Sequence, residues 1–164
     1  MNAPQALPPI KLIALDVGLA RIGVATCDPL GIAVRPLVTI HRRSRQEDFD
    51  RLVAIVAEQE AEALVVGLPL SMDGSESEQT QMTRTWALRL ARALRSARKE
   101  PIPVIFWDER LSSFAAQELM ADAPKRAQAI GEDAYAAAVI LRSYLDARSR
   151  GEGERWGRIE LPKK

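Results

Sequence analysis

Short apolar runs in the N-terminal part of the chain predict three strands, over residues 11–17, 21–27 and 32–40. A run that is apolar at successive positions indicates a strand covered on both faces. The links between these strands, residues 18–20 and 28–31, are too short for a crossover helix. Tight turns of this kind join antiparallel strands, whereas parallel strands need a longer connection. The three strands are therefore predicted to form an antiparallel meander.

Further along the chain, helical spacing alternates with two more apolar runs. Helices are predicted over 47–59 and 78–99, each followed by a short strand, over 63–67 and 104–107, and a last helix is predicted over 132–148. This order predicts an α/β fold with a mixed five-stranded sheet, three antiparallel strands and then two parallel ones, and helices on both faces. The apolar stripe that should face the core from the longest helix consists of Met82, Trp86, Leu90, Leu94 and Ala97.

A single domain is predicted over residues 11–148, preceded by a flexible lead over 1–10 and followed by a charged, mobile tail over 149–164. With one cysteine, Cys27, the chain cannot form an internal disulfide. No apolar run approaches the ~20 residues of a membrane span and the first ten residues lack a secretory pattern, so no membrane association is expected. Together with the single cysteine, this makes the cytoplasm the expected compartment. The formal net charge of +1 means that any nucleic-acid-binding surface has to be local.

Three acidic residues occupy positions at which α/β sheets carry their functional sites. Asp16 ends the first predicted strand, Glu109 follows the fifth, and Asp133 begins the last helix on its apolar face. Carboxylates brought together repel one another strongly unless a cation compensates their charge. Because these oxygen ligands are not accompanied by a histidine or cysteine pattern, Mg²⁺ or Mn²⁺ is the expected cofactor. Two such ions about 3.5–4 Å apart can activate a water and stabilise a leaving oxygen, which suggests hydrolysis of nucleic-acid phosphodiesters.

Each of these acids also has a simpler explanation, and the residues alone do not decide between the two. A carboxylate at the end of a strand could be an ordinary solvated loop residue. Asp133 could serve only to stabilise the positive N-terminus of its helix. Asp108 could replace Glu109 as the acid that faces the site, since side chains alternate along a strand.

Other polar residues near these acids are candidate contacts to nucleic acid or phosphate. Arg21 and Arg110 could hold a phosphate, or each could form a structural ion pair with a carboxylate. The loop over 67–77 precedes a helix, so its N–H groups could receive a phosphate, or its serines could only cap the helix. The remaining candidates are Ser71, Gly74 and Ser75 in that loop, and Ser112 and Ser113, which are N-cap candidates of a helix predicted over 111–120.

Four segments, in order along the chain, carry a family resemblance. They are Asp16-Val17-Gly18 with Arg21-Ile22-Gly23-Val24-Ala25; Val65-Val66-Gly67-Leu68-Pro69-Leu70 with Met72-Asp73-Gly74-Ser75; Asp108-Glu109-Arg110-Leu111-Ser112-Ser113; and Asp133-Ala134 with Ala136-Ala137 and Ile140-Leu141. Together they closely resemble the bacterial YqgF family, also called RuvX, described as candidate Holliday-junction resolvases and pre-16S rRNA nucleases. The resemblance covers roughly residues 11–145. It implies a ribonuclease H-like fold, with Asp16, Glu109 and Asp133 as the catalytic, metal-binding acids.

The same resemblance implies a divalent-metal-dependent nuclease that processes the 5′ end of pre-16S rRNA in ribosome biogenesis. The alternatives are a resolvase of branched DNA and a non-catalytic RNA-binding module in transcription or ribosome assembly. Structured RNA or branched DNA is thus the expected partner, and the chain could act as a monomer or a homodimer. The chain departs from the family pattern where Ser112-Ser113 replace a stretch that usually contains Thr, and where Gly131-Glu132 precede Asp133 in place of a basic residue.

Overall fold

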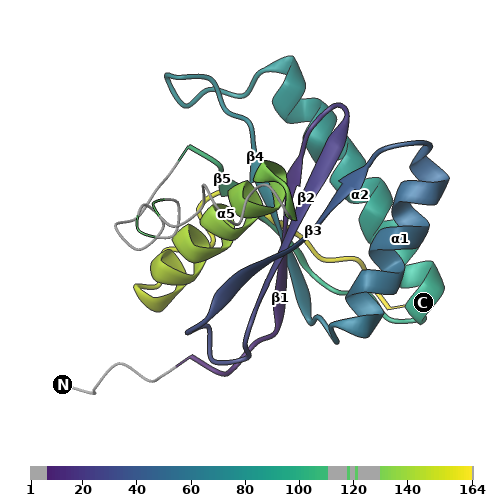
Figure 1. The fold of residues 1–164 in the computed structure, drawn as a ribbon, viewed down its shortest axis with the longest axis horizontal. Coiled ribbons are helices and arrows are strands. Elements are labelled where there is room, and N and C mark those ends of the chain that lie inside the picture. Colours follow the sequence, from purple (N-terminus) through teal and green to yellow (C-terminus); the bar gives the residue numbers. More distant parts are fainter. Residues whose placement is uncertain (1–6, 111–117, 119–120, 122–129, 164) are drawn as a thin grey trace.

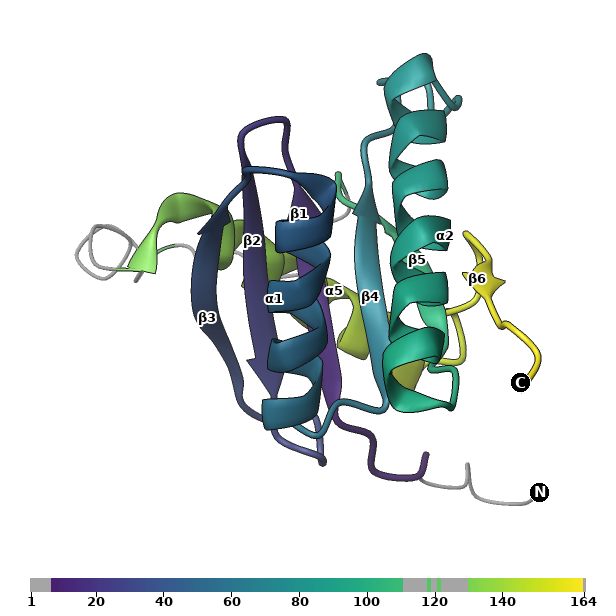
Figure 2. The ribbon, with the colours of Figure 1, turned by 90° about the vertical axis from the view of Figure 1, so that its right-hand side faces the viewer.

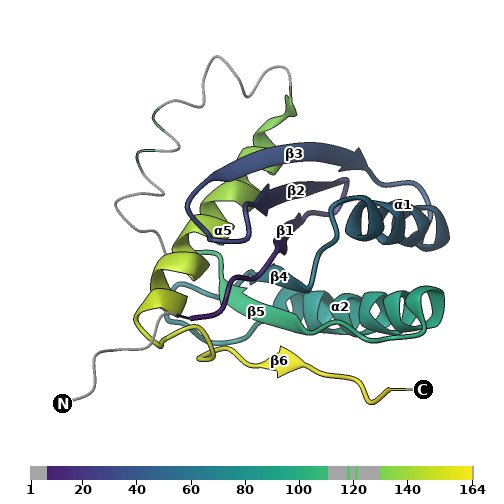
Figure 3. The same ribbon diagram turned by 90° about the horizontal axis from the view of Figure 1, so that it is seen from below.

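The computed structural model of this 164-residue chain describes residues 7–110, 118, 121 and 130–163 (Figure 1). The helix predicted over 111–120 falls almost entirely outside these residues, and so do Ser112 and Ser113. The described elements form three layers, in which a central sheet carries helices on both faces (Figure 3).

A mixed sheet of six strands forms the central layer. Its strands are β1 (Leu12–Val17), β2 (Arg21–Cys27), β3 (Val34–His41), β4 (Ala63–Leu68), β5 (Val104–Asp108) and β6 (Arg158–Ile159). They lie in the order β3-β2-β1-β4-β5-β6. β1, β2 and β3 pair antiparallel, whereas β1, β4 and β5 pair in parallel. The predicted α/β sheet, three antiparallel strands and then two parallel ones, is therefore confirmed.

The sixth strand comes from residues 149–164, the segment predicted to be a mobile tail. β6 pairs antiparallel with β5, with Ile159 beside Val104, and it lies at the edge of the sheet (Figure 2). The prediction of five strands is therefore wrong by one. A strand of two residues is too short to show any periodicity, so no pattern in the sequence indicates it.

Helices cover both faces of the sheet. Within the described residues, α1 (Arg45–Glu58) and α2 (Glu78–Arg98) lie on one face and α5 (Glu132–Ser149) lies on the other (Figure 3). Ser44 and Ser77 begin α1 and α2, because each side chain accepts a hydrogen bond from the backbone N–H three residues further on. Across the described ranges, no helix has the length and apolar character needed to cross a membrane.

Strand alternation sorts the β1 side chains between the two faces of the sheet. Leu12 and Ala14 belong to the buried cluster that contains α5 residues, whereas Ile13 belongs to the cluster that contains α1 and α2 residues. Successive side chains of a strand point to opposite faces. Asp16 therefore lies on the α5 face of the sheet, and Val17 lies on the face covered by α1 and α2.

The apolar stripe predicted for α2 is confirmed in its centre and wrong at its ends. Trp86, Leu90 and Leu94 are buried, but Met82 is 58% exposed and Ala97 is also exposed. The first turns of α2 reach past the end of β4 (Figure 2). Met82 therefore has no strand beneath it, and this part of α2 overhangs the end of the sheet.

Candidate active site

The β2 strand brings Asp16 and Asp133 together. Asp16 pairs with Gly23 in the antiparallel register, so both residues lie on the same face of the sheet. A Cβ at Gly23 would lie 1.8 Å from the carbonyl oxygen of Asp133, so the first turn of α5 rests directly on the Gly23 backbone. Asp133 consequently lies beside Asp16, although the two residues are far apart in the sequence.

The residues before α5 fix where that helix begins. Gly131, the N-cap residue of α5, has a φ of +100°, which favours glycine. Because glycine has no side chain, it cannot cap the helix with a side-chain hydrogen bond. A Cβ at Gly131 would lie 2.4 Å from Oγ1 of Thr39 on β3. The same Thr39 hydroxyl donates a hydrogen bond of 2.9 Å to the carbonyl oxygen of Ile130. Close backbone packing on β2 and β3 therefore positions Asp133, rather than a side-chain cap.

Arg21 forms an ion pair with Asp133. Its Nε donates to Oδ2 of Asp133 over 2.7 Å, with side chains that are 53% and 28% exposed. Because the arginine is half exposed, the pair adds only about 0–1 kcal/mol to the free energy of unfolding. Its main consequence is orientation, since it turns one Asp133 oxygen toward β2. A phosphate contact by the other N–H groups of Arg21 stays a prediction.

Glu109 approaches from the other side of Asp16. It follows β5, two residues after Trp107, which packs in the cluster on the α5 face. β4 lies between β1 and β5, and its Gly67 places no side chain between the two acids. A Cβ at Gly67 would lie 3.3 Å from Cβ of Glu109 and 2.6 Å from Cδ1 of Ile140. Gly67 therefore keeps open the space that separates Glu109 from Asp16.

Asp108, the alternative acid at the end of β5, forms an ion pair with Arg110. The Asp108 side chain is 1% exposed, its Oδ1 accepts from Nε of Arg110 over 3.0 Å, and its Oδ2 accepts from Nη2 of Arg110 over 2.8 Å. Arg110 also donates to the carbonyl oxygens of Ser71 and Met72 over 2.8 and 2.9 Å. Arg110 therefore forms a structural ion pair with a carboxylate, the second of the two roles considered for it. A contact between Arg110 and nucleic acid stays a prediction. Glu109 is the acid left to face the site.

The loop between β4 and α2 uses its N–H groups internally. Ser71 N–H donates to the carbonyl oxygen of Ser75, and Gly74 N–H donates to that of Ser71. Both the N–H and the hydroxyl of Ser75 donate to Oδ1 of Asp73. The N–H groups of these three residues are therefore not free in this structure. Phosphate contacts by Ser71, Gly74 and Ser75 stay a prediction, and they would require this loop to exchange its internal hydrogen bonds.

Electrostatic repulsion links the three predicted acids. Burial, and then the nearby charge of Asp133, raise the pKa of Asp16 from 3.8 to about 6. Burial also raises the pKa of Glu109, with further contributions from the charges of Asp16 and Asp108. A carboxylate that is both desolvated and near other carboxylates holds its proton more tightly. The site is thus a partly buried concentration of negative charge.

Comparison with known proteins assigns the chain to a family. The sequence profile described as "RuvX: Holliday junction resolvase" matches residues 10–147. This chain belongs to the RuvX family. Its predicted family resemblance is therefore confirmed, and the match covers the described sheet and helices except β6 and the last residues of α5.

Curated relatives of this RuvX-family chain include proteins from Synechococcus elongatus and Sphingopyxis alaskensis, each named "Putative pre-16S rRNA nuclease". The first is 43% identical over 143 residues, covering 85% of this chain and 91% of that protein. The second is 44% identical over 142 residues, covering 85% and 89%. Among solved structures, Thermus thermophilus RuvC in complex with a Holliday junction substrate is similar, with a TM-score of 0.49 and 16% identity, over 85% of this chain and 95% of that one.

The acids of this RuvX-family chain fit a divalent cation in donor type and charge. Carboxylate oxygens suit Mg²⁺ and Mn²⁺, and a cation would relieve the repulsion that raises the pKa values of Asp16 and Glu109. Among the described residues, however, no three Asp, Glu, His or Cys side chains form a group that could hold a metal ion. Asp133 has one oxygen turned to Arg21. We expect cation binding to involve a rotation of this side chain toward Asp16.

The residues that sequence reasoning missed in this RuvX-family site are glycines. Gly23 and Gly67 lie within the family segments, and each is needed because another part of the chain packs closely against it. The backbone of α5 packs against Gly23, and the side chains of Glu109 and Ile140 pack against Gly67. A glycine inside a predicted strand does indicate a close approach. That signal could have marked both positions, but it does not identify the approaching residue.

Proposed function

We propose that this RuvX-family protein hydrolyses nucleic-acid phosphodiesters, and that its substrate is the 5′ end of pre-16S rRNA. The observation that carries this proposal is the electrostatic effect of Asp133 on Asp16 and of Asp16 on Glu109, which together with burial raises the pKa values of Asp16 and Glu109. Such a site favours cations and substrates that bring cations. The names of the curated relatives support rRNA as the substrate. A precursor rRNA substrate would place the activity in the cytoplasm.

The three acids have distinct proposed roles. Asp16, Glu109 and Asp133 would hold Mg²⁺ or Mn²⁺, which when bound supplies charge neutralisation at the phosphate and an activated water. Asp16 lies between the other two acids, so it would contact the cation from the centre of the site. Arg21, half exposed beside Asp133, is positioned to orient that carboxylate and to offer its free N–H groups to a phosphate oxygen.

The test is cleavage of two labelled substrates by the full chain, a precursor of 16S rRNA and a four-way DNA junction. Each is incubated with Mg²⁺, with Mn²⁺ and with a chelator. We expect cleavage of the RNA that requires a divalent cation. Preferential cutting of the junction would contradict rRNA processing as the function and would support the Holliday junction resolvase activity after which the family is described. Metal-independent binding of RNA without any cleavage would contradict nuclease function altogether.

The raised pKa of Asp16 predicts the pH dependence of this activity. The carboxylate must be ionised to hold a cation, and its pKa of about 6 means that protons compete below that pH. Cleavage rates should therefore rise between about pH 5 and pH 7. Because cation and proton compete for the same oxygens, tenfold more Mg²⁺ should move the midpoint to lower pH. Initial rates at constant ionic strength would test this. A pH midpoint of the cleavage rate that does not change with the Mg²⁺ concentration would contradict it.

A further inference from the structure

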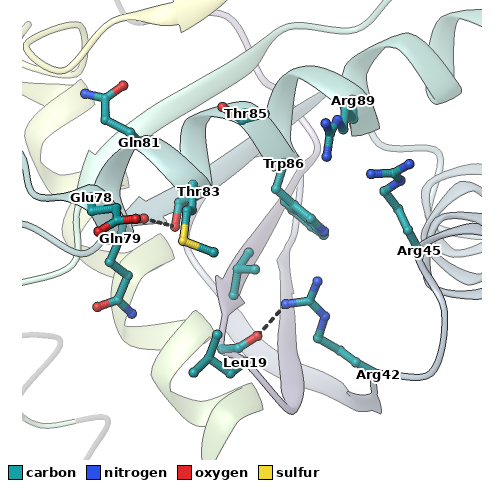
Figure 4. Close-up of a pocket in the computed structure, with 13 residues that line it drawn as sticks. Leu19, Arg42, Arg45, Glu78, Gln79, Gln81, Thr83, Thr85, Trp86 and Arg89 are labelled. Carbon is teal, nitrogen blue, oxygen red and sulfur yellow. Dashed lines mark hydrogen bonds between the residues drawn. The ribbon is translucent and has the colours of Figure 1, made fainter.

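A cavity lies on the opposite face of the sheet from the acids. It has a volume of about 480 Å³, and its wall includes Val17, Leu19, Arg45, Trp86 and Arg89 (Figure 4). We call it the α2 groove, since the first half of α2 forms one side and the turn between β1 and β2 forms another. A volume of this size is in the range of small-ligand sites.

The α2 groove lies close to Asp16, the central acid, because the next residue along β1 lines the groove. Val17 lines the groove, and Asp16 precedes it on the other face of the sheet. The two places are separated only by the end of β1 and its exposed turn, in which Leu19 is 85% exposed. A chain passing over this turn would therefore reach both the groove and the acids.

Arginines give the groove a positive charge. Arg42 donates to the carbonyl oxygen of Gly18 over 2.7 Å and lies 3.5 Å from Asp48, so it is partly compensated. Within the described residues, the side chains of Arg45 and Arg89 make no ion pair or hydrogen bond. Arg45 is also the first residue of α1, where the helix dipole disfavours a cation. In Figure 4 all three guanidinium groups gather around Trp86. Contacts within the described part of the chain account for the charge of Arg42 but not for those of Arg45 and Arg89, which an anionic ligand would compensate.

The other side of the groove is apolar and unusually exposed. Leu19 and Met82, 85% and 58% exposed, line it together with Trp86. The Trp86 side chain is 8% exposed, and its Nε1 is buried without a partner among the described residues. Exposed apolar surface suits a nucleobase, and adjacent arginines suit the phosphates on either side of it.

We propose that the α2 groove binds an unpaired nucleotide of the RNA strand whose phosphate reaches the acids. This inference rests on the proposed nuclease function and adds a requirement to it: the substrate carries a single-stranded segment next to the cut. Exposed apolar surface beside the guanidinium groups of Arg45 and Arg89 matches a base beside its phosphates in a single strand. A base inside a duplex is stacked and paired, so it cannot enter such a groove.

The test measures binding in the presence of chelator, so that no cleavage occurs. A fluorescein-labelled single-stranded oligoribonucleotide of about ten nucleotides is titrated with the full chain, and anisotropy is followed over a range of salt concentrations. The double variant Arg45→Ala/Arg89→Ala should bind roughly tenfold more weakly. Its slope of log affinity against log salt should be shallower by about 1 to 1.5, since each phosphate contact to a single strand contributes about 0.7.

A matched control removes the same charge from the same two helices. Arg51 and Arg98 are exposed residues of α1 and α2 that do not line the groove, and Arg51→Ala/Arg98→Ala should bind RNA like the unmodified chain. Equal losses in both double variants would show nonspecific attraction and overturn the proposal. Unchanged binding by Arg45→Ala/Arg89→Ala would also overturn it and leave the groove to a protein partner. Circular dichroism of each variant checks its fold.

Cleavage then separates this inference from the proposed function. The unmodified chain should cut an RNA with an unpaired segment beside the cut at least tenfold faster than a fully paired one, and Arg45→Ala/Arg89→Ala should reduce that ratio. If the unmodified chain cuts both RNAs equally, the groove inference fails while the nuclease function stands. If RNA binding depends on the groove but nothing is cut, the nuclease function fails while RNA binding in the groove stands.

Discussion

Replacing Asp16 by Asn should abolish cleavage and at the same time make the folded protein more stable. Asp16 is the central acid of the site, and an amide cannot supply the negative charge that holds a divalent cation. Losing several kcal/mol of cation-dependent stabilisation of the transition state corresponds to a rate at least ~10³-fold lower. Initial rates of pre-16S rRNA cleavage measure this loss.

The gain in stability follows from the pKa of the same carboxyl group. Its pKa is 3.8 when the chain is unfolded and about 6 in the folded state, so folding favours the protonated form. The contribution of this group to stability is therefore complete below about pH 4 and is lost as the pH rises through 6. The loss amounts to about 2–3 kcal/mol at neutral pH. Asp16→Asn should remove this loss, so its advantage in the free energy of unfolding appears at pH 7 and vanishes near pH 4.

Urea unfolding at both pH values measures this difference, and Asp50→Asn is a suitable control. Asp50 is an exposed residue of α1 away from the site, so its substitution should change neither activity nor the pH dependence of stability. A less stable Asp16→Asn protein at pH 7 would show that the carboxylate has a stabilising partner. Full activity in that variant would remove Asp16 from the proposed mechanism.

Replacing Gly23 by Ala should destabilise the fold by about 3 kcal/mol or more. The new Cβ would lie 1.8 Å from the carbonyl oxygen of Asp133, and this neighbour is backbone that cannot rotate away. The first turn of α5 would have to lift from β2, which also moves Asp133 away from Asp16. Cleavage should consequently fall even in the fraction of molecules that remain folded. Urea unfolding and rates per folded molecule measure the two effects.

Gly151→Ala separates steric collision from backbone strain. Gly151 follows α5 with a φ of +76°, and a Cβ there would meet no atom of the described residues within 4 Å. Its substitution should cost only about 1–2 kcal/mol, the strain of a left-handed residue, and should leave cleavage unchanged. If Gly23→Ala were no more destabilising than Gly151→Ala, the close packing of α5 on β2 would be contradicted.

The sheet could be predicted because its rules are local. The short links after β1 and β2 force antiparallel pairing. Alternation along β1 places the side chains of Asp16 and Val17 on opposite faces of the sheet. The prediction for Met82 failed because helical periodicity gives the direction of a side chain but not the length of the sheet beneath it. β6 was missed because its pairing with β5 depends on a contact between distant parts of the chain.

The candidate site could be predicted only in part. The strand ends and the family segments led to Asp16, Glu109 and Asp133, but not to the ion pair between Asp133 and Arg21, which are 112 residues apart. Nor could the α2 groove be predicted, since Arg45 and Arg89 belong to different helices and meet only when both pack on the sheet. Contacts of this kind depend on tertiary packing, which neither periodicity nor a motif contains.

The edges of the sheet bear on how this protein behaves at high concentration. An uncovered edge strand can pair with the edge of another molecule and begin aggregation. Here β6 covers part of β5, and on the far side β3 carries Pro36, which lacks an N–H, next to an irregular register between Val24 and Ala25. Both edges thus resist the addition of a further strand. Truncation before β6 would uncover β5 and should increase the tendency of this chain to aggregate.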